Sequence, residues 1–202
     1  MNKDQLRDLI GNQEFSITPD YATAIELIHL LVKKYDGIVQ PCYEFCLKYE
    51  EIAAVNLIFA LEKMNSTLET WEREVRKIQT LTKNTALSAH LLLILGKKNA
   101  EHSDMAHAIE IYEEVIARYP DSYRLDEVAG FRVYALEAFE QKLHIYQTQK
   151  GTAEKLKQVR SQMRDHYQRI RQMLKGGEGY EMIKDRFEKQ KTENGIIRQG
   201  PF

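Results

Sequence analysis

The sequence has few of the residues that interrupt helices or crosslink loops. Of its 202 residues, four are proline, ten are glycine and two are cysteine. This composition argues against a loop-rich or fibrous protein. The single possible pair, Cys42 and Cys46, is not the disulfide framework of a small secreted domain, and a reducing, cytoplasmic compartment is expected. Four residues apart on a helix, the two cysteines are interpreted as small core residues.

Long apolar runs and net charge are also missing. No apolar run reaches the roughly 18 residues that a membrane span needs. The first residues are polar, so we expect no signal peptide. The net charge of −1 gives the whole chain no bulk attraction to nucleic acid or to a membrane. The expectation is a soluble intracellular protein that does not act at a membrane.

What the sequence does contain is apolar residues at helical spacing, in a chain that is 43% hydrophobic and 29% charged. An all-α fold is therefore expected, because no alternation typical of strands was found. Thr18 is predicted to cap the second helix and Ser66 the fifth. The expected helices cover residues 2–10 (ended by Gly11), 19–35, 41–49, 51–64, 67–81, 89–96 (followed by a polar link), 105–119, 123–149, 153–175 and 178–191.

The expected domain organisation follows from the distribution of charged residues and from the helix-breaking residues between segments. Residues 1–150 carry 17 basic and 23 acidic residues and are predicted to form a helical, repeat-like domain. Residues 151–192 are predicted to be a C-terminal helical extension, of which 151–175 carries 7 basic and 2 acidic residues. Residues 193–202 are predicted to be a flexible tail.

One stretch, 89–122, has the spacing of a known repeat. Leu92 and Leu95 precede Gly96, Ala108 follows 12 residues after the glycine with Tyr112 four residues later, and Pro120 ends the second helix. This spacing resembles the 34-residue tetratricopeptide repeat. It departs from the pattern at Leu92 and at Asn99, where tryptophan and tyrosine are usual. One period of 34 residues later, Gly130 and Tyr146 stand where the pattern has Gly96 and Tyr112, but Lys142 stands at the small position of Ala108. One period earlier, the two small positions are occupied by Glu62 and Glu74.

The resemblance implies an array of antiparallel helical hairpins that binds proteins or peptides. In such arrays the first helix of each hairpin lines the concave surface, which implies a partner-binding role for a set of residues on three successive helices. That set is Asn56, Phe59, Lys63, His90, Leu93, Lys97, Arg124, Glu127 and Phe131. A binding mode that grips a peptide carboxylate would draw on Asn56, Lys63, Lys97 and Arg124.

The basic segment 153–175 offers other possibilities. Its cations are Lys155, Lys157, Arg160, Arg164, Arg169, Arg171 and Lys175. They could contact the acidic first part of the chain, a second copy of the chain, a protein partner or a nucleic acid. A heptad-like seam through Leu156, Val159, Met163, His166, Ile170 and Met173 would pack this helix. Arg160 and His166 also have a spacing similar to that of small helical ribonucleases, where such a pair would act at a phosphate.

No further chemical motif is present in the sequence. It has no glycine-rich phosphate loop, nucleophile elbow or recognised metal motif, and His102 and His107 have no ligand spacing. We therefore expect no cofactor, no metal and no catalytic residue. The predicted function is that of a non-enzymatic adaptor, chaperone or complex subunit. A nucleic-acid-binding subunit and a small helical ribonuclease are the alternatives.

Overall fold

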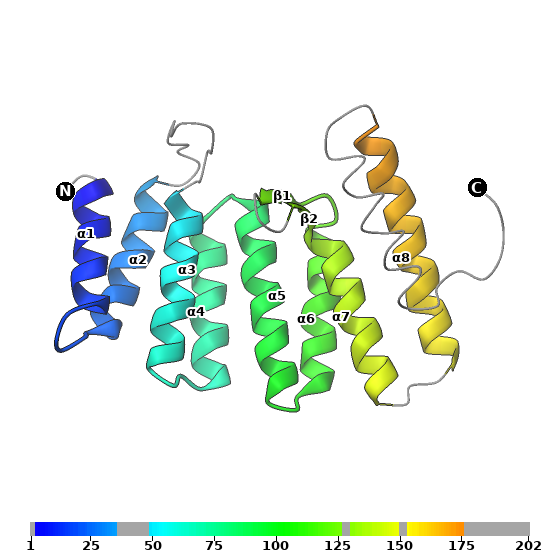
Figure 1. The fold of residues 1–202 in the computed structure, drawn as a ribbon, viewed down its shortest axis with the longest axis horizontal. Helices are drawn as coiled ribbons and strands as arrows, with labels where there is room; N and C mark the ends of the chain where they lie inside the picture. Colours follow the sequence, from blue (N-terminus) through cyan, green and yellow to red (C-terminus); the bar gives the residue numbers. More distant parts are fainter. Residues whose placement is uncertain (1–2, 36–48, 127–129, 150–152, 176–202) are drawn as a thin grey trace. The chain divides into compact units, whose positions relative to one another are not determined.

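A computed structural model describes residues 3–35, 49–126, 130–149 and 153–175 (Figure 1). Several predicted features lie outside these ranges: the helices 41–49 (except Tyr49) and 178–191, Cys42 and Cys46, and the tail 193–202. Within these ranges the elements are α1 (Lys3–Glu14), α2 (Tyr21–Tyr35), α3 (Tyr49–Lys63), α4 (Leu68–Leu81), α5 (Thr85–Glu101), α6 (Met105–Arg118), β1 (Tyr123–Asp126), β2 (Gly130–Val133), α7 (Tyr134–Thr148) and α8 (Ala153–Met173).

The described part is mostly helical, which confirms the predicted helical character. No helix in the described ranges is both long enough and apolar enough to cross a membrane. The chain divides into two compact units, Met1–His102 and Ser103–Phe202. The boundary expected between residues 150 and 151 falls inside the second unit.

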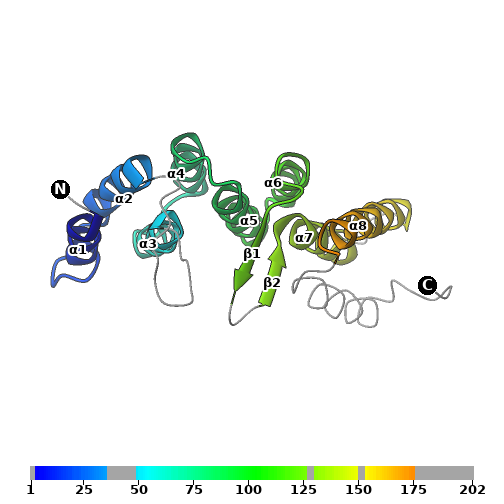
Figure 2. The same ribbon diagram turned by 90° about the horizontal axis from the view of Figure 1, so that it is seen from above.

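The first unit stacks helices in two layers. Helix α2 packs against α1, α3 and α4, and α5 packs against α3 and α4. Seen from above, α1 and α3 lie in one layer and α2 and α4 in the other (Figure 2). Helix α4 is amphipathic and buries Trp71, Val75 and Ile78 along one face. Helix α5 buries residues on several faces, which explains its continuous apolar run.

An apolar core joins β2, α7 and α8 of the second unit. Helix α7 packs against both α6 and α8. The core brings together residues of β2, α7 and α8: Val133, Phe139, Leu143, Val159, Met163, Tyr167 and Ile170. The predicted seam of α8 is therefore partly right, since three of its residues are buried. Met173 is exposed, however, and Tyr167 takes a buried place that the heptad did not assign.

Several predicted helix ends were wrong. Helix α1 continues through Gly11 to Glu14 and α5 through Gly96 to Glu101, because glycine lowers helix stability without forcing an end. Asp20, not Thr18, caps α2 by accepting the Thr23 amide at 3.0 Å.

At α4 the cap is Thr67, which accepts the Thr70 amide, and not Ser66. In both cases a nearby polar side chain accepts the backbone hydrogen bond in place of the predicted one.

The helix predicted from Tyr123 was also wrong, because a β-ribbon precedes α7. Strands β1 and β2 pair antiparallel, with Tyr123 opposite Val133. Apolar and polar residues alternate in both strands, which is the signal that the sequence contained. Residues 124 and 131 therefore lie on two strands and do not share a helix face.

Helices α4 and α6 share a burial pattern at an offset of 37 residues. The buried set of α4 with its C-cap is Trp71, Glu74, Val75, Ile78 and Thr82, and that of α6 with its C-cap is Ala108, Ile111, Tyr112, Val115 and Tyr119. The N-caps Thr67 and Asp104 keep the same offset. The preceding turns contain Asn65 (φ 49°) and Ser103 (φ 67°), both left-handed. This offset differs from the 34-residue step of the predicted repeat.

Candidate functional site: a pocket with a buried lysine

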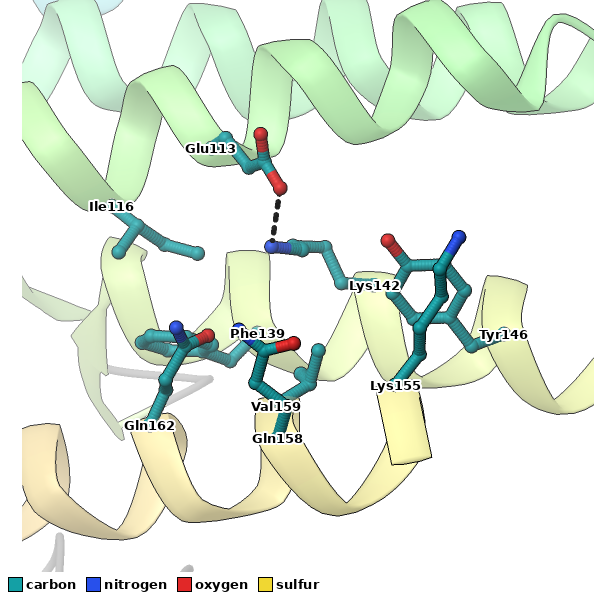
Figure 3. Close-up of a pocket in the computed structure, with 9 residues that line it drawn as sticks. All are labelled: Glu113, Ile116, Phe139, Lys142, Tyr146, Lys155, Gln158, Val159 and Gln162. Carbon is teal, nitrogen blue, oxygen red and sulfur yellow. Dashed lines mark hydrogen bonds and ion pairs between the residues drawn. The ribbon is translucent and has the colours of Figure 1, made fainter. Parts of the chain in front are cut away.

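Helices α6, α7 and α8 enclose a pocket of about 390 Å³ in the second unit (Figure 3). Its walls combine apolar, amide and charged side chains. The lining residues are Glu113, Ile116, Phe139, Lys142, Tyr146, Lys155, Gln158, Val159 and Gln162.

A buried cation defines the chemistry of the pocket. Lys142 extends from α7 toward α6, and its Nζ donates to Glu113 Oε1 at 2.9 Å (Figure 3). The Lys142 side chain is 6% exposed, whereas that of Glu113 is 58% exposed. A buried charge needs a partner, and Glu113 is the one ion-pair partner of Lys142 among the described residues. Since an ammonium carries three donors, the pocket offers a cation with unused hydrogen-bonding capacity.

Tyr146 and Lys155 form the end of the pocket near the start of α8. The Lys155 ammonium lies over the Tyr146 ring, 5.8 Å from its centroid. Burial raises the pKa of the Tyr146 hydroxyl, and the charge of Glu113 raises it further. The phenol therefore stays protonated at neutral pH and can donate a hydrogen bond.

The remaining lining residues supply an apolar floor and two amides. Ile116, Phe139 and Val159 are apolar, and the amides of Gln158 and Gln162 come from α8 (Figure 3). Each amide can both donate and accept hydrogen bonds. Such a mixture suits a ligand that places an apolar group on the floor and an acidic group near Lys142.

The structure does not bring the predicted ribonuclease pair together. Arg160 and His166 are six positions apart on α8, which separates them by about 120° around the helix axis. A ring nitrogen of His166, Nε2, lies 2.9 Å from the Pro120 carbonyl oxygen, and the ring packs against Phe139. Burial lowers the pKa of His166, and the charge of Arg169 lowers it further. Neither Arg160 nor His166 lines the pocket.

Two of the residues implied by the repeat resemblance, Phe59 and Lys63, lie in an aromatic cluster of the first unit. Phe59 on α3 stacks on Phe15 with ring centroids 5.4 Å apart, and Tyr21 meets it edge-on. Lys63 lies over the same ring at 5.4 Å, and Asn56 is one turn away on α3. Phe15, just after α1, and Tyr21, at the start of α2, were not among the predicted residues, because both are distant from α3 in the sequence.

The other implied residues are scattered. On α5, His90 and Lys97 are half-buried and Leu93 is fully buried. The backbones of Arg124 and Phe131 lie on β1 and β2, and Glu127 lies outside the described residues.

Among the described residues no three histidine, cysteine or acidic side chains gather as a metal site. No protein-family model, curated protein or solved structure matches this chain.

Proposed function

We propose that this chain is a non-enzymatic protein-binding subunit. Its second unit would bind a short segment of a partner protein in the pocket between α6, α7 and α8. The observation that carries this proposal is Lys142, a lysine buried beside the apolar floor of a pocket of about 390 Å³. The partner segment would present a carboxylate next to an aliphatic or aromatic side chain.

The electrostatic setting supports an acidic ligand. Lys142 is desolvated, so an incoming carboxylate meets a charge that water screens little. Charge-assisted hydrogen bonds of this kind are roughly twice as strong as neutral ones. Glu113 is mostly exposed and can return to water when a ligand replaces it at Lys142.

The arrangement of the helices supports a scaffold role. Two amphipathic helices, α4 and α6, have matched caps and burial 37 residues apart, and a degenerate array of antiparallel hairpins similar to tetratricopeptide repeats would contain such helices. Proteins built in this way commonly use the faces of their helices for recognition. We therefore propose a hairpin array of this kind as the architecture of the subunit.

A selection from a displayed library of random peptides tests the proposal. We expect the wild-type chain to enrich peptides with an acidic residue next to an apolar one. Lys142→Met keeps the length and the apolar stem of the side chain but removes the charge. The enriched peptides should lose at least about tenfold in affinity for this variant, which corresponds to about 1.4 kcal/mol.

Lys77→Met is the matched control, because Lys77 is an exposed lysine on α4 in the first unit. Its affinity for the same peptides should equal that of the wild type. Circular dichroism of both variants checks that the helices are intact. Enriched peptides that bind Lys142→Met as tightly as wild type would refute the proposed site.

A further inference from the structure

Helix α8 divides its cations into two groups with different surroundings. Lys155 lines the pocket and lies over the Tyr146 ring. Arg169 is ion-paired with Asp121, in the segment between α6 and β1. The other five cations of this segment lie on a different side of the helix: Lys157, Arg160, Arg164, Arg171 and, in the turn just after the helix, Lys175.

The position of this side follows from the buried residues. The apolar stripe of Val159, Met163, Tyr167 and Ile170 fixes the face of α8 that enters the core. With about 100° per residue, the five cations fall within a sector of roughly 60° on one flank of that stripe. The two acidic residues of the segment, Glu154 and Asp165, fall outside this sector.

The five cations therefore form a continuous row, which we call the cationic row. From Lys157 to Lys175 it extends roughly 27 Å, at about 1.5 Å per residue. Lys157, Arg164 and Lys175 are exposed, and Arg160 and Arg171 are partly exposed. The neutral residues next to this sector, on the side away from the buried stripe, are Ser161 and Gln168, both hydrogen-bonding residues.

We propose that the cationic row binds the phosphate backbone of a nucleic-acid duplex. A row of like charges without interspersed acids is complementary to a polyanion of regular charge spacing. Arginine, lysine, serine and glutamine are the side chains that contact phosphate and sugar oxygens.

The composition of the row distinguishes this ligand from other polyanions. A protein interface has an apolar core, and an interfacial membrane helix buries an apolar face in the bilayer. The row contains no apolar side chain from Lys157 to Lys175, so it offers neither. It also contains no aromatic side chain on which an unpaired base would stack, which favours a duplex and sequence-independent binding.

The test measures the binding of the full chain to fluorescently labelled duplexes of about 20 base pairs, one of DNA and one of RNA, by anisotropy. At low salt we expect binding to at least one duplex, with an affinity that falls steeply as salt is raised. Neutralising two central positions with Arg164→Gln and Arg171→Gln should reduce the affinity at least about tenfold and lower the salt slope by about 2.

A variant of equal net charge serves as the control. Asn12→Asp with Gln147→Glu removes the same two units of charge at exposed positions of α1 and α7, neither of which belongs to the row. Its affinity for duplex should stay within about twofold of wild type. An equal loss in both double variants would overturn the proposal, because it would assign the binding to net charge alone.

Two further measurements separate this inference from its rivals. Tighter binding to poly-glutamate or to phosphatidylserine vesicles than to either duplex would overturn it, as would the absence of duplex binding at low salt. Lys142→Met should leave duplex binding unchanged, since Lys142 lies in the pocket and not on the row. The two proposals can therefore fail separately.

Discussion

Replacing Tyr167 by alanine should destabilise the second unit by about 3–5 kcal/mol. Tyr167 is one of the largest fully buried side chains in the described part, and it packs in the core that joins α7 and α8. Its removal takes away a large apolar contact area and leaves a cavity, because neighbouring helices close such gaps only in part. The loss is comparable to the whole stability of a small domain.

Urea denaturation followed by circular dichroism measures this effect. Tyr123→Ala is the matched control, since it deletes the same side chain at a position that is 47% exposed. We expect it to cost less than about 1 kcal/mol. If Tyr167→Ala cost no more than Tyr123→Ala, the docking of α8 through this core would be refuted.

A destabilised α8 has a functional consequence as well. Val159, on the same buried stripe, forms part of the pocket floor. Peptides selected on the wild-type chain should therefore lose affinity for Tyr167→Ala even at temperatures at which the variant remains helical.

The second large effect concerns Glu14, a buried carboxylate in the first unit. Its side chain ends α1, is 2% exposed and has no hydrogen-bond partner for either oxygen among the described residues. Burial raises the pKa of Glu14 from 4.5 to about 7. Its place at the C-terminal end of a helix also disfavours a negative charge.

The sign of the pH dependence follows from the proton balance. Between pH 4.5 and about 7 the folded chain holds a proton on Glu14 that the unfolded chain has released. Stability is therefore present at low pH and is lost as the pH rises through this window, by about 3 kcal/mol. Glu14→Gln cannot ionise, so the variant should gain about that much relative to wild type between pH 5 and pH 8.

The chain's single tryptophan, Trp71, lies buried on α4 in the same unit and reports its unfolding by fluorescence. Asp8→Asn, at an exposed acid on α1, is the control and should change the free energy of unfolding by no more than about 0.5 kcal/mol.

His29 contributes to the pH dependence of stability in the opposite direction, because burial lowers its pKa. The comparison of variant with wild type cancels that contribution. A Glu14→Gln difference that is the same at pH 5 and pH 8 would contradict the prediction.

The sequence predicted the positions of most described helices because their apolar residues recur with the helical period. Helices α4 and α6 show this best, since each buries one clear stripe. Helix ends were less predictable where two capping residues are adjacent, as at Ser66 and Thr67. The β-ribbon was missed because its strands are only four residues long, too short for alternation to stand out.

The pocket could not be predicted, because its partners are distant in the sequence. Glu113 and Lys142 are 29 positions apart, and only the packing of α6 on α7 brings them together. The sequence did hold one signal. Lys142 places a charge at the apolar spacing of its helix, three residues after Phe139, and a conflict of that kind often marks a functional site.

The hydrogen bond between His166 and Pro120 has a consequence for the order of folding. Contacts between neighbouring helices close short loops, which form early and fast. His166 and Pro120 are 46 positions apart, and Arg169 and Asp121 are 48 apart. During synthesis the segment after α6 therefore waits for α8 to leave the ribosome. We expect these two contacts to form last, and α8 to be the first helix released when the second unit unfolds.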